Sequence, residues 1–135
     1  MRWALSPARG LRSDTVNSTG PGTTITGFAD NGGVRLYWAL DRPPGAGDTV
    51  PAGDAVPGGD AVPGGDTVPL LLINGLGSPL VAFEPGLVDL LVARGFAVLR
   101  FDNRDVGRSD RVEQGPPGQP TPYTLADMAG DAAAA

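Results

Sequence analysis

The chain has 135 residues and a formal net charge of −5, and it contains neither cysteine nor histidine. This length bounds it to at most one domain of usual size, and the composition excludes disulfides, thiolate or imidazole metal sites, and histidine-based acid–base catalysis by these residues. The basic residues are all Arg and form no basic patch for nucleic acid, and no apolar run approaches the ~20 residues that span a bilayer.

The N-terminal part predicts a tail followed by a hairpin. Residues 1–22 are polar and rich in turn formers, which predicts a flexible tail. Their apolar patch at residues 3–5 is shorter than the ~7–15 residues of a secretory signal, so we expect a cytoplasmic protein. Residues 23–30 and 34–40 are rich in strand-forming residues and flank a short Asn-Gly-Gly turn, which predicts a β-hairpin.

A six-residue repeat follows the hairpin, with the units GDTVPA, GDAVPG, GDAVPG and GDTVPL over residues 47–70. Each unit has a Pro without an amide donor and at least one Gly, so neither a helix nor a β-ladder continues through it. Four such units are also too short a stretch for a stacked solenoid. We therefore expect a surface loop over residues 43–69, inserted into one domain that spans residues 23–135.

The second half predicts alternating strands and helices. Residues 70–73 are an apolar run typical of a strand buried on both faces of a parallel sheet. Pro85 suits the first turn of a helix and Gly95 its left-handed cap, and residues 96–101 are a second buried-type strand. This order predicts a parallel βαβ unit with a right-handed crossover. A capping box at residues 124–127 then predicts the start of a further helix, so the fold class is α/β.

The turn after the first parallel strand is the first candidate site, with the sequence Asn74-Gly75-Leu76-Gly77-Ser78. Glycines let backbone amides point outward at the carboxyl end of a parallel strand, where open α/β sheets bind ligands. One function for such an amide is an oxyanion hole. A tight strand-to-helix turn without a ligand explains the glycines equally well.

The second candidate site is the loop after the next parallel strand, residues 102–110, with the sequence DNRDVGRSD. The alternating Asp and Arg residues favour a structural interpretation, in which ion pairs fix the shape of the loop, over a direct role in catalysis. Arg104 can bridge carboxylates. The loop fails as a calcium-binding EF-hand because Arg104 and Val106 occupy ligand positions, so no metal is expected. Neither Ser109 nor Ser78 fits the Gly-x-Ser-x-Gly nucleophile elbow.

These segments together resemble the α/β-hydrolase superfamily, and more narrowly its small bacterial esterases related to aclacinomycin methylesterases. PLLLINGLGSP is similar to that family's third strand and oxyanion loop, GFAVLRFDNRDVGRSD to its fourth strand and following loop, and YTLADMAGD to the helix before the nucleophile strand. The resemblance covers about residues 24–135, with the repeat tract as an insertion. It implies a truncated hydrolase-type sheet that consists of the hairpin, one parallel βαβ unit and the start of a further helix.

The resemblance implies a role for each matching position. The amide of Leu76 would be one oxyanion donor, and Asn74 stands where many relatives have His. The other implied residues shape the oxyanion loop (Asn74, Gly75, Gly77, Ser78) or the second loop (Asp102, Arg104, Gly107, Ser109).

In this family the triad follows these loops in the order Ser, acid, His. The chain is therefore expected to be the N-terminal portion of a serine hydrolase whose parent cleaves small-molecule carboxylic esters without a cofactor. Because it lacks the nucleophile and the His, we expect no turnover by the chain alone. The sequence does not specify an oligomeric state.

Two alternatives remain open at the level of sequence. Gly75-x-Gly77 after a strand, with Asp102 closing the next strand, is similar to a dinucleotide-binding βαβ unit, but Leu80 stands where the third glycine belongs. The other alternative is a non-catalytic interaction fragment in which the acidic Pro/Gly tract is the functional part.

Overall fold

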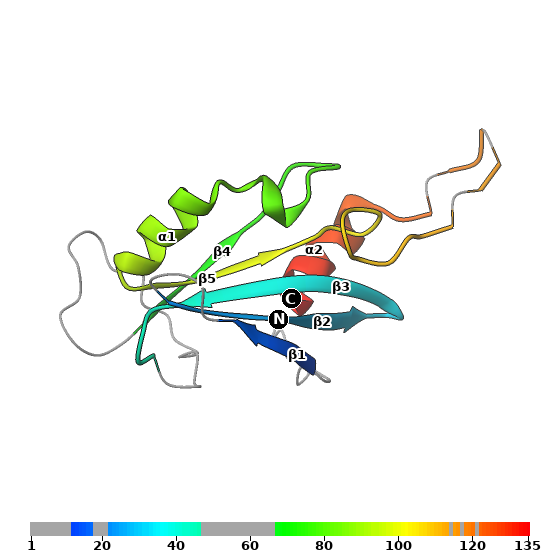
Figure 1. Cartoon of the computed structure of the whole chain (residues 1–135). Coiled ribbons are helices and arrows are strands. Elements are labelled where there is room, and N and C mark those ends of the chain that lie inside the picture. Colours follow the sequence, from blue (N-terminus) through cyan, green and yellow to red (C-terminus); the bar gives the residue numbers. More distant parts are fainter. Residues whose placement is uncertain (1–11, 18–21, 47–66, 114, 117, 121) are drawn as a thin grey trace, which may run out of the picture.

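The computed structural model of the chain describes residues 12–17, 22–46, 67–113, 115–116, 118–120 and 122–135 (Figure 1). These residues form a mixed sheet with the strand order β1-β2-β3-β5-β4, in which β4 and β5 are parallel and the other pairs antiparallel. The α/β class expected from the sequence is confirmed. The elements are β1 (Arg12–Asn17), β2 (Thr23–Asn31), β3 (Val34–Arg42), β4 (Val68–Leu72), the short 3-10 helix η1 (Leu80–Ala82), α1 (Pro85–Ala93), β5 (Phe96–Phe101) and α2 (Leu125–Ala134).

The predicted hairpin is confirmed, and it forms the centre of the sheet. β2 and β3 pair in register from Thr23 opposite Arg42 to Asn31 opposite Val34. The connecting residues Gly32 and Gly33 have φ angles of 63° and 90°. A two-residue hairpin turn of this hand requires a positive φ at both positions, which glycine adopts without a steric cost.

The prediction of a flexible tail over residues 1–22 is wrong for residues 12–17. These residues form β1 and pair antiparallel with β2, with a register shift between Ser13 and Thr15. Local propensity is weak here, because Thr15 and Val16 are the only β-branched residues of the strand. The open edge of β2 supplies the pairing partner, and this contact is not encoded in the short segment itself.

The parallel βαβ unit is confirmed, but its first strand begins and ends earlier than predicted. The prediction that this strand is buried on both faces is wrong, since Leu71 is 37% and Ile73 59% exposed. β4 starts at Val68 and includes Pro69, so the predicted loop over residues 43–69 is too long at its C-terminal end. The amide of Val68 donates to the carbonyl of Gly95. Because the backbone amides of successive residues in a strand point to opposite sides, the backbone nitrogen of the next residue, Pro69, faces away from β5. β4 is the outer strand of the described sheet, so the missing amide of Pro69 interrupts no described ladder bond. The repeat units at residues 47–66 lie outside the described residues.

The two helices cover opposite faces of the sheet. Val88 and Val92 of α1 pack on Val98 of β5, and Gly95 after the helix has a φ of 91°, as expected of its cap. On the other face, Ala132 and Ala135 at the end of α2 pack against a cluster of Trp38, Phe101 and Ala29. No helix in the described ranges is long and apolar enough to cross a membrane.

Candidate functional site

The parallel pair β4 and β5 brings both sequence-predicted segments to one edge of the sheet. The side-chain amide of Asn103, just after β5, donates to the backbone carbonyl of Asn74, just after β4, at 3.3 Å. The carboxylate of Asp102 accepts a bond of 2.6 Å from the amide of Leu80 at the start of η1. The loop after β5 therefore contacts the turn after β4 at both ends of that turn.

The turn itself is a type II β-turn from Gly75 to Ser78. The amide of Ser78 donates to the carbonyl of Gly75 at 3.2 Å, and Gly77 at the third position has a φ of 78°, which a type II turn requires there. Leu76 is 81% exposed. Within the part of the chain that the structure describes, its amide donates no hydrogen bond. The turn thus presents a backbone donor that a ligand can use.

Asp102 is the first residue of the loop after β5, residues 102–110, which we call the supporting loop. It is 2% exposed. One carboxylate oxygen accepts from Leu80 and the other from the amide of Arg108 at 2.9 Å. Gly107 lies against this carboxylate, because a Cβ added there would overlap Oδ2. Asp102 therefore joins η1 to its own loop, and Gly107 provides the space that this contact needs.

Ser109 is buried, and both functions of its hydroxyl are used. Oγ donates to the carbonyl of Asp102 at 2.6 Å and accepts from the amide of Tyr37 on β3 at 2.8 Å. The amide of Asp102 in turn donates to the carbonyl of Tyr37 at 2.8 Å. Ser109 therefore links the loop to β3, and its bonded hydroxyl is not placed to act as a nucleophile.

Arg104 forms a buried ion pair with Asp131, a residue that sequence reasoning missed. The guanidinium Nε and Nη2 each donate to one carboxylate oxygen at 2.7 Å. Hydrogen bonding to Asp131 raises the pKa of Arg104 above its ordinary value, so the guanidinium stays charged. The guanidinium also stacks over the ring of Tyr123, 5.0 Å from its centroid. A signal for Asp131 did exist in the sequence, since it is the one charged residue in the run MAGDAAAA.

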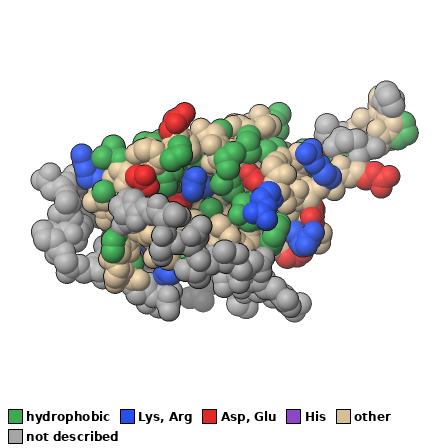
Figure 2. All heavy atoms as spheres, viewed as in Figure 1, with side chains coloured by type: hydrophobic (Ala, Val, Ile, Leu, Met, Phe, Trp, Pro, Cys, Tyr) green, Lys and Arg blue, Asp and Glu red, His purple; other side chains and the backbone are tan. Residues whose placement is uncertain are grey.

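Charges of both signs surround the exposed rim of this loop. Arg35 donates to both carboxylate oxygens of Asp110, at 3.0 and 3.3 Å, and this contact holds the pKa of Asp110 below its usual range. The guanidinium of Arg108 lies over the ring of Tyr37 at 4.2 Å. In Figure 2, Arg side chains and Asp or Glu side chains are intermixed where this loop leaves the sheet. Because charges of both signs are intermixed here, the loop does not create an electrostatic potential of one sign that would attract a charged ligand.

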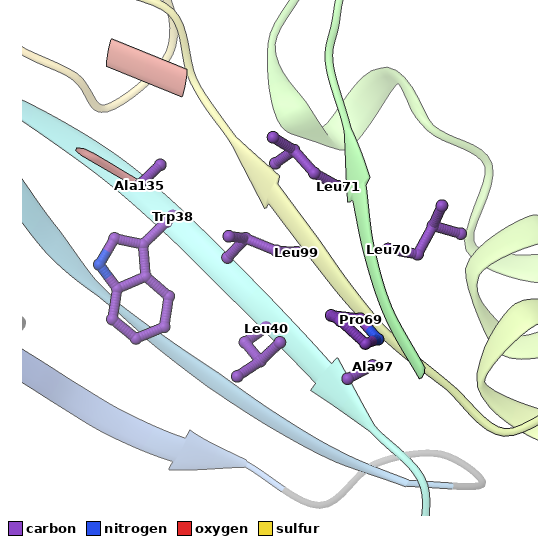
Figure 3. Close-up of a pocket in the computed structure, with 8 residues that line it drawn as sticks. All are labelled: Trp38, Leu40, Pro69, Leu70, Leu71, Ala97, Leu99 and Ala135. Atoms are coloured by element: carbon purple, nitrogen blue, oxygen red, sulfur yellow. The ribbon is translucent and has the colours of Figure 1, made fainter. Parts of the chain in front are cut away.

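A separate cavity of about 400 Å³ lies on the face of the sheet that carries α2 (Figure 3). Apolar side chains surround it, and Leu71, Leu99 and Leu40 approach it from three adjacent strands. Its remaining lining residues are Trp38, Pro69, Leu70, Ala97 and Ala135. The cavity holds no ionisable side chain, so it offers apolar contact rather than chemistry. Within the described ranges, no cluster of three or more His, Cys, Asp or Glu could hold a metal ion.

A comparison with models of protein families finds none that matches the chain, and a comparison with curated proteins finds no significant match. The geometry of the turn and its supporting loop therefore carries the functional assignment.

Proposed function

We propose that the chain is the N-terminal portion of a serine hydrolase with the α/β-hydrolase fold, and that the amide of Leu76 is one donor of its oxyanion hole. The observation that carries this proposal is the Leu76 amide, which donates no hydrogen bond among the described residues and lies at the carboxyl edge of two parallel strands, held by the contacts of Asp102 and Asn103. Preorganised backbone donors at such a position stabilise the negative charge that develops on a carbonyl oxygen during acyl transfer. The parent reaction is hydrolysis of carboxylic esters through an acyl-enzyme.

The order of the strands supports this proposal. An antiparallel hairpin is followed by β5 and then by β4 as the outer strand, although β4 precedes β5 in the chain. In a hydrolase of this type, the strand that carries the nucleophile pairs with the free side of β4. The apolar cavity beside β4 and the 59% exposure of Ile73 fit a surface that such a strand would cover.

The residues of this chain orient the turn and supply one donor of the oxyanion hole, the amide of Leu76. They do not supply the nucleophile or the base. The hydroxyl of Ser109 is committed to Asp102 and Tyr37. No histidine occurs among the 135 residues, so the base of a Ser-His-acid triad is not among them. Ester hydrolysis by the chain alone is therefore expected to equal the buffer rate.

The geometry favours this proposal over a dinucleotide-binding unit. In that motif the glycine-rich turn leads directly into a helix whose N-terminus holds the pyrophosphate. Here α1 begins at Pro85, and η1 separates it from the turn at Gly75 to Ser78. Titration with NAD is expected to show no saturable binding, and binding that Asp102→Ala abolishes would reverse this preference.

The test is a chimera in which residues 1–135 replace the matching N-terminal part of an active esterase of this fold. Leu76→Pro removes the amide donor, and Pro suits the second position of a type II turn, so the turn is kept. Leu76→Ala removes the same side chain and keeps the amide. We expect kcat for p-nitrophenyl acetate to fall ~10²–10³-fold in Leu76→Pro and to change little in Leu76→Ala.

Equal rates for the two variants, with matching cooperative melting, would show that the amide of Leu76 does not act on the substrate. The coding sequence downstream of residue 135 provides an independent check. A Gly-x-Ser-x-Gly motif followed by an acid and then a His is expected there, and an open reading frame without them would contradict the proposed parent.

A further inference from the structure

The side chain of Asn103 is buried at the junction of the two loops. It is 3% exposed, and its Nδ2 donates to the carbonyl of Asn74 at 3.3 Å. A buried amide that lost this partner would remain desolvated without compensation, so the contact is favoured once the site is formed. Asn103 follows Asp102 directly, which places its side chain at the end of β5.

The carbonyl that Asn103 contacts belongs to the peptide plane between Asn74 and Gly75, immediately before the turn. Packing does little to hold that turn, because a Cβ added at Gly75 or at Gly77 would meet no atom within 4 Å. The side chain of Asn74 does not hold it either, since its Nδ2 is buried without a partner among the described residues. The bond from Asn103 is thus the anchor on the β4 side of the turn, and the bond from Leu80 to Asp102 is the anchor on the far side.

We infer that Asn103 is a positioning residue for the amide of Leu76. It fixes the peptide plane at Asn74, and the rigid plane fixes the direction in which the turn presents its free amide. The use of that amide as an oxyanion donor rests on the proposed function, whereas its rigidity does not. An oxyanion donor acts only within ~2.7–3.1 Å of the developing charge, so loss of the anchor lowers kcat and leaves KM nearly unchanged.

The test measures backbone order in the full chain by ¹⁵N relaxation. Asn103→Leu keeps the approximate volume of the side chain and removes the donor. Asn31→Leu is the matched control, because Asn31 also donates a side-chain amide bond, at 2.7 Å, but to Asp131 of α2 and not to a residue of the turn. We expect the order parameter of the Leu76 amide to fall from about 0.85 to below about 0.6 in Asn103→Leu and to remain high in Asn31→Leu.

An unchanged Leu76 order parameter in Asn103→Leu would overturn the inference, and so would an equal fall in both variants. If Asn103→Leu does not fold, hydrogen exchange of the Asn103 side-chain amide in the unsubstituted chain decides. Slowed exchange supports the anchor, and exchange at the rate of a free amide refutes it.

The oxyanion role of the Leu76 amide and the positioning role of Asn103 can be refuted independently of each other. Equal rates for the Leu76→Pro and Leu76→Ala chimeras would refute the oxyanion role and leave the relaxation result intact. In an active chimera, Asn103→Leu is expected to lower kcat alone and to have no further effect when combined with Leu76→Pro. Additive losses would show that Asn103 acts by another route than the Leu76 amide.

Discussion

Arg104 in the loop after β5 and Asp131 in α2 form a two-point ion pair with both N–O distances at 2.7 Å. Asp131 is completely buried, and Asn31 at the end of β2 donates to the same carboxylate at 2.7 Å. One carboxylate therefore connects the loop, α2 and the hairpin. The position of the candidate site relative to α2 depends on this contact.

Removal of one partner of this pair is expected to destabilise the chain strongly. Asp131→Leu leaves the guanidinium of Arg104 buried without a counter-charge, which costs ~3–5 kcal/mol in comparable pairs. The double variant Arg104→Met with Asp131→Leu replaces both charges by apolar groups and should regain most of that loss. Urea unfolding followed by far-UV circular dichroism measures both. A double variant as unstable as the single one would show that the charge is not the cause.

Gly107→Ala is expected to destabilise the chain more than Gly32→Ala. The two glycines have similar φ angles, 54° and 63°, so both substitutions introduce comparable backbone strain. A Cβ at Gly32 meets no atom within 4 Å, whereas at Gly107 it overlaps the carboxylate of Asp102. We expect an additional loss of ~1–3 kcal/mol in Gly107→Ala, measured by thermal unfolding. Equal losses would mean that Asp102 can move aside at no cost.

The pair of Arg35 and Asp110 predicts a pH dependence of stability. Hydrogen bonds from Arg35 lower the pKa of Asp110, and the same contact raises the pKa of Arg35. The unfolded chain therefore binds a proton at Asp110 more readily than the native chain does. The stabilisation is present above the ordinary pKa of Asp, ~3.9, and is lost as pH falls through the lower native value.

Denaturant unfolding of Asp110→Asn and the unsubstituted chain tests this pH dependence. The unsubstituted chain should be the more stable of the two at pH 7, and the difference should shrink below about pH 4. Added salt at pH 7 should reduce the difference as well, because Arg35 is exposed. A difference that does not vary with pH would assign the effect of the substitution to packing.

The free side of β4 predicts self-association. All five residues of β4 pair with β5, and the other side of this apolar strand has no partner in the described sheet. Unpaired apolar edge strands template pairing between chains, and a charged residue on the edge prevents it. Ile73 directly follows β4 and is 59% exposed, so Ile73→Lys should reduce concentration-dependent aggregation, as measured by light scattering.

Val81→Lys is the control for this prediction, because Val81 is also β-branched and is 74% exposed, but it lies on η1. It is expected to have little effect on aggregation. Equal effects of the two substitutions would assign the association to general surface hydrophobicity. A monomeric unsubstituted chain at all concentrations would contradict the prediction itself.

Elements whose signals lie within a few residues were predictable. The hairpin follows from the Asn-Gly-Gly turn between two strand-forming runs, and the structure pairs these runs as β2 and β3. The capping box is present as predicted, with the amide of Asp127 donating to Thr124 Oγ1 at 3.3 Å and the amide of Thr124 donating to Asp127 Oδ2 at 2.6 Å. In both cases the signal that specifies the element lies within a few consecutive residues.

The contacts that build the site join residues far apart in the chain. Asn31 and Asp131 are separated by 100 positions, and Asn103 and Asn74 by 29. The alternation of Asp and Arg after β5 indicated a loop held by ion pairs, but α2 had to pack against the sheet before Asp131 became the partner of Arg104. Residue type and local spacing determine which groups can pair, whereas the packing of the sheet and helices decides which of them meet, because an ion pair or a hydrogen bond depends on distance in space and not on separation in sequence.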